Sequence, residues 1–113
     1  MSPIRTYYLV SVSNPVMYQI PEQICRENEI IYIDLNEYIL DNHNLPLTIR
    51  IKDNDGLNIY LNNNNILQYQ WDISDTGLHT ITIEAENSAK LKNEMSFNIL
   101  VLVPPSINRS YFY

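Results

Sequence analysis

A tight corner followed by strictly alternating residues, at positions 75–87, restricts the fold of this sequence more than any other feature. Three apolar residues, Ile81, Ile83 and Ala85, alternate there with the polar residues Thr80, Thr82, Glu84 and Glu86. A period of two predicts a β-strand with one face on a core and the other in water. In a β-sandwich, a corner before such a strand carries the chain from one sheet to the other. The sequence therefore predicts an all-β sandwich.

Short β-prone segments fill the rest of the chain, separated by Asn, Asp, Pro and Gly. We expect strands at residues 6–13, 16–20, 29–35, 47–52, 57–61, 66–71, 78–86 and 95–103. Only residues 19–28 could hold a helical turn or two. The segment Asp53-Asn54-Asp55-Gly56 is predicted to be a hairpin turn, because Asp-Gly supplies the positive φ angles that such turns require.

The length of 113 residues fits one domain. We expect an N-terminal extension or strand over residues 1–15, the sandwich over 16–103, and a tail over 104–113 that begins with two prolines. The alternation within the strands predicts the core side chains, which are Ile31, Ile33, Leu35, Leu47, Ile49, Ile51, Trp71, Ile81, Ile83, Ala85, Phe97, Ile99 and Val101.

The charge balance restricts the partners. The chain has 13 acidic and 7 basic residues, a net charge of −6. A nucleic-acid-binding protein needs a basic face, and anionic lipid would repel this chain. No segment reaches the length of a membrane span, so membrane insertion is not expected either. A protein is therefore the expected partner.

The N-terminal segment and the composition give hints of source. The apolar run at residues 7–10 is too short for a signal peptide core. If Met1 is the native start, we expect synthesis in the cytoplasm. Ile occurs 16 times and Asn 15 times, against two each for Gly and Ala. Coding DNA rich in A and T would produce this bias, as in several large DNA viruses, some phages and some low-GC bacteria.

Three stretches of the sequence resemble known β-sandwich families. Asp75-x-Gly77-x-His79 resembles the corner of immunoglobulin-like domains, with His79 at the usual Tyr position and Ile81 where antibody domains have a cysteine. Residues 33–41 with 45–49, and residues 95–101, resemble cadherin-like (dystroglycan-type) and polycystic-kidney-disease-type repeats. The similarity covers about residues 17–103. It implies an immunoglobulin-like two-sheet antiparallel sandwich of about seven strands, here with an extra N-terminal strand, that acts as a non-catalytic spacer, adhesive or assembly module.

Calcium is the one cofactor that the resemblance raises, because many such repeats bind it through acidic loops. Here Lys90 stands in the corresponding segment where an acid or Gly would help. We expect no cofactor and keep Asp41, Asp53 and Asp55 as weak calcium candidates. A loop with Asp53 and Asp55 lacks the bidentate Glu that such a site needs. Asp41 is expected to face the loops at residues 62–65 and 87–93.

Other reactive side chains have structural explanations. His79 is expected to replace the corner Tyr and to hydrogen-bond the backbone. Cys25, the only cysteine, is expected to be a half-buried hydrophobe rather than a reactive thiol. Trp71 is assigned to the core, with a sugar-stacking surface shared with Tyr69 and Tyr60 as the alternative. We find no motif of an enzyme.

Candidate partner-binding residues lie near both ends of the chain. Leu100 and Leu102 occupy the otherwise polar face of the last strand, so either the N-terminal strand or a partner should cover them. The terminal aromatics either fold back or anchor the chain in a neighbour. These are Tyr7, Tyr8, Tyr111, Phe112 and Tyr113.

These features predict a non-catalytic structural protein, which we place first at a virion surface. It would be a capsid decoration or cementing protein, and its partner a shell or scaffold protein or copies of itself. The alternative is an adhesion or spacer module of a bacterial or protist cell-surface protein. In that case the loops at 41–45, 62–65 and 87–93 would carry recognition.

Overall fold

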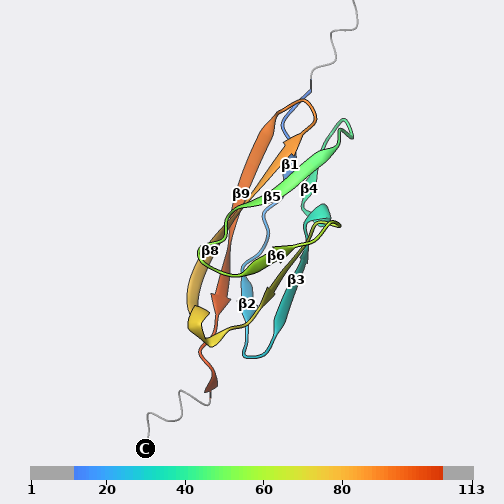
Figure 1. Ribbon diagram of the computed structural model, residues 1–113. Helices are drawn as coiled ribbons and strands as arrows, with labels where there is room; N and C mark the ends of the chain where they lie inside the picture. Colours follow the sequence, from blue (N-terminus) through green and yellow to red (C-terminus); the bar gives the residue numbers. More distant parts are fainter. Residues whose placement is uncertain (1–11, 106–113) are drawn as a thin grey trace, which may run out of the picture.

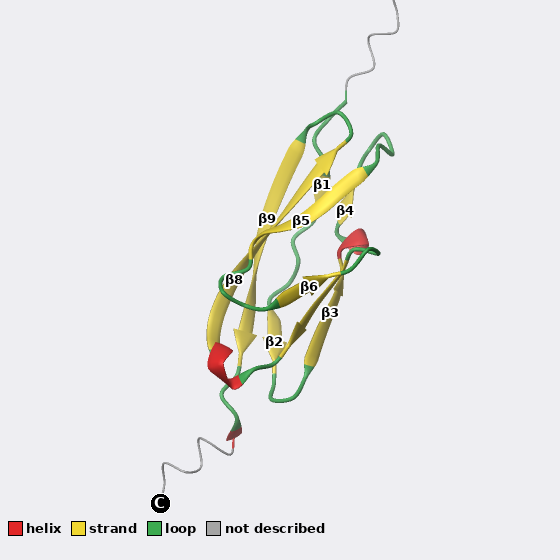
Figure 2. Ribbon diagram, in the orientation of Figure 1, coloured by secondary structure: helices red, strands yellow, loops and turns green. Residues whose placement is uncertain are grey.

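The computed structural model describes residues 12–105, and they form a β-sandwich (Figures 1 and 2). One sheet has the order β2-β9-β8-β5, the other the order β3-β7-β6, and β1 pairs with β4. The strands are β1 (Val16–Met17), β2 (Gln23–Cys25), β3 (Ile30–Asp34), β4 (Ile39–Leu40), β5 (Leu47–Asp53), β6 (Ile59–Leu61), β7 (Ile66–Gln70), β8 (Gly77–Asn87) and β9 (Lys92–Val101). Two short 3-10 helices, η2 (Leu35–Glu37) and η3 (Ile73–Asp75), complete the described elements.

The long antiparallel pair β8 and β9 forms the centre of the four-stranded sheet. Strand β5 pairs antiparallel with β8, and β2 pairs parallel with β9. Helix η3 lies between β7 and β8, so the predicted corner does carry the chain from one sheet to the other (Figure 1). Together these elements confirm the predicted all-β, immunoglobulin-like sandwich.

The core lies between the sheets, where every second residue of the strands points inward. Ten of the thirteen predicted core residues are buried, and the other three, Leu47, Ile51 and Trp71, are partly buried against the same cluster. The core also contains side chains that the strand patterns did not mark, namely Ile20, Cys25, Ile39, Leu57, Leu67, Tyr69 and Met95. Several of them come from loops or from strands too short to show alternation.

The prediction of a hairpin at residues 53–56 is wrong. Asp55 and Gly56 do adopt positive φ angles, 51° and 79°. However, β5 pairs with β8 and β6 pairs with β7, so this turn crosses between the sheets. An Asp-Gly pair reverses the chain locally and does not determine which strand the next segment joins.

Three further expectations need correction or lie outside the described residues. Residues 19–28 form no helix and instead contain β2. The strand predicted at residues 6–13 lies outside the described part of the chain except for Val12 and Ser13, which are not in a strand. Glu84, expected on the water-facing side, is only 6% exposed. It pairs with Arg50 on the neighbouring strand, and this neighbour helps to cover it.

The packing of Ile81 offers a test of the fold. Ile81 is fully buried, so Ile81→Ala should remove apolar contacts and leave a cavity that lowers the free energy of unfolding by about 2–5 kcal/mol. Urea denaturation followed by tryptophan fluorescence measures this change. Leu78→Ala is the matched control on the same strand, because Leu78 is 59% exposed, and its effect should stay below about 1 kcal/mol. Equal losses in the two variants would contradict the assigned faces.

Candidate functional site

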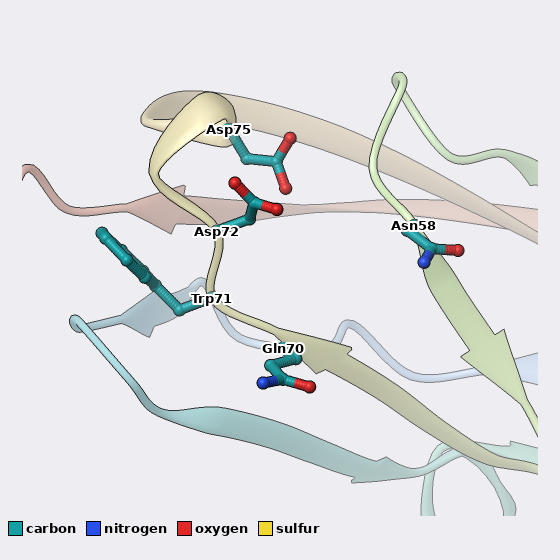
Figure 3. A pocket seen from close by; sticks show the side chains of 5 residues that line it. All are labelled: Asn58, Gln70, Trp71, Asp72 and Asp75. Carbon is teal, nitrogen blue, oxygen red and sulfur yellow. The ribbon is translucent and has the colours of Figure 1, made fainter.

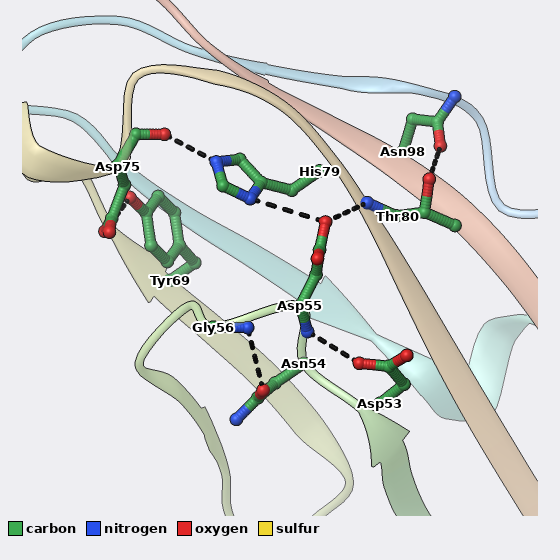
Figure 4. Close-up of polar contacts among 9 residues, drawn as sticks. All are labelled: Asp53, Asn54, Asp55, Gly56, Tyr69, Asp75, His79, Thr80 and Asn98. Atoms are coloured by element: carbon green, nitrogen blue, oxygen red, sulfur yellow. Dashed lines mark hydrogen bonds and ion pairs between the residues drawn. The ribbon is translucent and has the colours of Figure 1, made fainter.

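Polar contacts fasten the corner between β7 and β8 (Figure 4). The hydroxyl of Tyr69 donates to Asp75 Oδ2 at 2.7 Å, and His79 Nε2 lies 2.6 Å from the backbone oxygen of Asp75. This contact confirms the predicted hydrogen bond of His79 to the backbone. Asp55 Oδ2 accepts from the N–H of Thr80 at 3.0 Å and lies 3.5 Å from His79 Nδ1. These contacts therefore join the corner to β7, through Tyr69, and to the turn after β5, through Asp55.

Asp53 and Asp55, two of the calcium candidates, already accept hydrogen bonds in this turn. Asp53 Oδ1 accepts from the N–H of Asp55 at 2.8 Å, and Asp55 holds Thr80 and His79 as described above. Within residues 12–105, no group of three or more His, Cys, Asp or Glu side chains is placed to hold a metal ion. The calcium site stays a prediction for these two residues.

The third calcium candidate, Asp41, is 6% exposed at the end of the sandwich near the β8–β9 turn. It accepts from the N–H of Leu45 and of His43 at 2.9 Å, and from the side-chain amide of Asn87 at 3.0 Å. These donors, with Leu45 first, hold the pKa of Asp41 below its ordinary value. The expected proximity to the 87–93 loop is thus seen at Asn87. The 62–65 turn instead bonds to Asn36, through Asn64 and Asn65.

Cys25 was expected to be half-buried but lies fully buried in the core. Its Sγ lies 3.6 Å from the backbone oxygen of Glu29. Burial, and next the charge of Glu29, raise the pKa of the thiol. A thiol that is shielded from water and hard to ionise is a poor nucleophile.

An apolar patch lies on the outer face of the four-stranded sheet, beside the point where β9 ends. Ile24 pairs with Leu100, and Leu100 pairs with Leu78, so the three side chains lie side by side across β2, β9 and β8. Ile24 is 46% exposed, Leu78 is 59% exposed and Leu100 is half-buried. We call these three residues the apolar patch. The predicted partner residue Leu100 is its centre.

Leu102, the other predicted partner residue in the described chain, is half-buried directly beyond β9. Its N–H donates to the backbone oxygen of Cys25 at 3.0 Å, and its own carbonyl accepts from Trp71 Nε1 at 2.9 Å. The described chain therefore covers the last residues of β9, at 99–101, with β2, and Trp71 contacts the segment directly beyond them. The aromatic candidates Tyr7, Tyr8, Tyr111, Phe112 and Tyr113 lie outside residues 12–105.

The remainder of this outer face is polar: the neutral pairs Thr80–Asn98 and Thr82–Ser96 lie next to the patch, and charged pairs lie farther along. Arg50 pairs with Glu84, and Lys52 Nζ lies 2.6 Å from Glu94 Oε2. The hydrogen bond and charge of Glu94 raise the pKa of Lys52. Register places Arg50, Glu84 and Glu94 in one row across β5, β8 and β9. The apolar patch is thus confined to one end of the sheet.

A pocket of about 270 Å³ opens where β7 ends (Figure 3). It is lined by Asn58, Gln70, Trp71, Asp72 and Asp75. The carboxylates of Asp72 and Asp75 turn toward the Asn58 side in Figure 3, and the Trp71 indole extends to the opposite side. Asp72 Oδ1 accepts from the N–H and the hydroxyl of Ser74, both at 2.9 Å, which lowers the pKa of this carboxyl.

The sugar-stacking surface considered for Trp71, Tyr69 and Tyr60 does not form from these three residues. Tyr69 is 1% exposed and points into the core, and Trp71 is partly buried against it. Tyr60 alone is on the surface, 63% exposed.

Within residues 12–105, no helix is long and apolar enough to cross a membrane.

Comparison with solved structures identifies the class of fold. The PKD domain from the KIAA 1837 protein superposes with a TM-score of 0.58 at 14% identity, over 85% of this chain and 94% of that domain. The endo-fucoidan hydrolase MfFcnA9 from glycoside hydrolase family 107 superposes with a TM-score of 0.55 at 19% identity, over 78% of this chain. This chain spans 16% of the hydrolase. No family model matches the chain, and no curated protein matches it.

These similarities confirm the predicted fold: the chain is an immunoglobulin-like sandwich of the type seen in PKD domains. They establish the fold alone.

The hydroxyl of Tyr69 gives a pH-dependent prediction. Burial, and next the hydrogen bond and charge of Asp75, raise its pKa. The resulting stability is present below about pH 10, where an unfolded tyrosine ionises, and is lost as pH rises toward the higher folded pKa. Tyr69→Phe should cost about 1 kcal/mol at pH 7 and weaken this alkaline loss. Urea denaturation between pH 7 and 11 measures both effects, and an unchanged alkaline loss in the variant would contradict the assignment.

Calcium binding can be tested by thermal melting. Because Asp41, Asp53 and Asp55 already accept backbone N–H groups, we expect millimolar calcium to leave the melting temperature within the error of an EDTA control. If calcium instead raises the melting temperature by several degrees and Asp41→Asn removes this rise, a calcium site lies at the end of the sandwich that contains Asp41.

Proposed function

We propose that this chain is a non-catalytic assembly module that docks onto another protein through the apolar patch. The observation that carries the proposal is the alignment of Ile24, Leu100 and Leu78 across three strands, two of them about half exposed or more. Exposed apolar side chains that are contiguous in this way are typical of interaction sites, whereas scattered ones need no explanation.

The energetics suit a contact that is repeated many times. Covering one of these half-exposed side chains would contribute about 1–2 kcal/mol, so the patch alone would give a weak contact. Many copies on a lattice would add avidity. With a net charge of −6, copies of this chain repel one another, which favours a different protein with a neutral or basic surface over self-association.

The first setting that we propose is a virus particle, with this chain as a decoration or cementing protein on its surface. The A/T-rich coding bias, visible in 16 Ile and 15 Asn, supports this source. The aromatic residues near both ends of the sequence, at positions 7, 8 and 111–113, would add further anchors to a shell protein.

The second candidate is an adhesion or spacer module at a cell surface. It is supported by the match along 94% of a PKD domain. The described chain also enters the sandwich at one end and leaves it at the other (Figure 1). That arrangement suits a link in a string of domains. In this setting the chain would act outside the cell as part of a larger protein.

A charge placed in the apolar patch tests the docking. Leu78→Lys should reduce co-sedimentation with purified particles of the source virus at least tenfold, because burying an ammonium group against an apolar partner is costly. Folding should be unaffected, since Leu78 is 59% exposed. Ile73→Lys is the matched control, because Ile73 is 51% exposed on η3, outside the patch, and it should co-sediment like the wild type.

Three outcomes test docking through the patch, anchoring by the tail and the choice between the two settings. Incorporation of Leu78→Lys at the wild-type level would contradict docking through the patch. Deletion of residues 106–113, which keeps the buried Pro104, tests anchoring by the tail independently. No co-sedimentation of the wild-type chain with particles, together with saturable binding to cells, would favour the adhesion module.

A further inference from the structure

The outer face of the three-stranded sheet has two exposed tyrosines with a glutamine between them. Tyr32 of β3 pairs with Gln68 of β7, and Gln68 pairs with Tyr60 of β6. Residues paired in this way point to the same face of a sheet, so the three side chains form one row. Tyr32 is 62% exposed and Tyr60 is 63% exposed. We call this row the tyrosine platform.

The geometry of the platform is fixed by the sheet beneath it. Two inter-strand spacings separate the backbones of Tyr32 and Tyr60, which is about 10 Å. The residues next to them in sequence, Ile31, Ile33 and Ile59, pack in or against the core and hold both strands. The two tyrosines therefore lie on a rigid surface, and both side chains remain exposed to solvent.

The polar pocket continues the platform along β7. Gln70 is the next outward residue after Gln68 and lines the pocket. Asn58, just before β6, lines it as well, together with Asp72 and Asp75 (Figure 3). Side-chain amides both donate and accept hydrogen bonds, and carboxylates accept them. Neighbouring sugar hydroxyls, which also donate and accept, match such a mixed set of groups.

We propose that the platform and the pocket bind a neutral glycan chain, with sugar rings stacked on Tyr32 and Tyr60 and hydroxyls bonded to Gln68 and Gln70. The apolar C–H face of a pyranose ring covers an aromatic ring while its hydroxyls stay at the rim. Two carboxylates and no Lys or Arg line the pocket, and the net charge is −6. A sulfated or uronic glycan would therefore be repelled, which leaves neutral sugars as the ligand class.

This inference goes beyond the proposed function, because it concerns the sheet opposite the apolar patch. The two surfaces lie on different sheets. A single domain could therefore hold a protein with one sheet and a glycan with the other. Leu78→Lys should leave glycan binding unchanged, and this separates failure of one proposal from failure of the other.

Titration of the full chain, followed by two-dimensional ¹⁵N–¹H NMR, tests the glycan site. Cellohexaose and chitohexaose serve as neutral probes and heparin as the sulfated one. We expect at least one neutral probe to shift the amide signals of Tyr32, Gln68, Tyr60 and Gln70. Tyr60→Ala and Tyr32→Ala should each weaken binding about tenfold, the ratio that corresponds to the loss of one buried aromatic face.

The matched control is Tyr18→Ala, because Tyr18 is 55% exposed outside both sheets and should not affect binding. The NMR spectrum of each variant also reports whether it is folded. The proposal is overturned if neither hexaose shifts the platform signals at millimolar concentration. It is equally overturned if heparin binds as well as the hexaoses do, or if Tyr18→Ala weakens binding as much as Tyr60→Ala.

Discussion

Packing of the inward faces of the two sheets is the interaction on which the rest of this molecule depends. Leu67 and Tyr69 of β7 lie in the same buried cluster as Ile81 and Ile83 of β8. Because side chains alternate between the faces of a strand, fixing the inward set also fixes the outward set. A slip of one residue would bury the tyrosine platform or the apolar patch and expose the core. Both surfaces are thus consequences of core packing.

The polar contacts hold the ends of the sandwich, whereas the core holds the two sheets together. Tyr69, Asp75, His79 and Asp55 hold the corner where the chain changes sheets, and Asp41 with Asn87 holds the opposite end. These side chains stabilise the two ends of the sandwich. The groups that we assign to recognition lie on the outer sheet faces and in the pocket, which Asp75 of the corner also lines.

Local patterns in the sequence predicted what is local in the structure. The strand at residues 78–86 and the backbone contact of His79 could be read from the alternation and from the corner motif. The tyrosine platform could not, because Tyr32 and Tyr60 meet only through the register of three strands. The three-residue strand β2 is too short to show a period, so its parallel pairing beside Leu100 was missed as well.

Native-state hydrogen exchange measures the shared core most directly. If the two sheets form one cooperative unit, the slowest amides of β7, at Leu67 and Tyr69, should exchange with the same free energy as those of β8, at Ile81 and Ile83, and that value should equal the free energy of global unfolding. Exchange of the β7 amides at a free energy several kcal/mol lower would contradict the account. The tyrosine platform would then rest on a separately opening sheet.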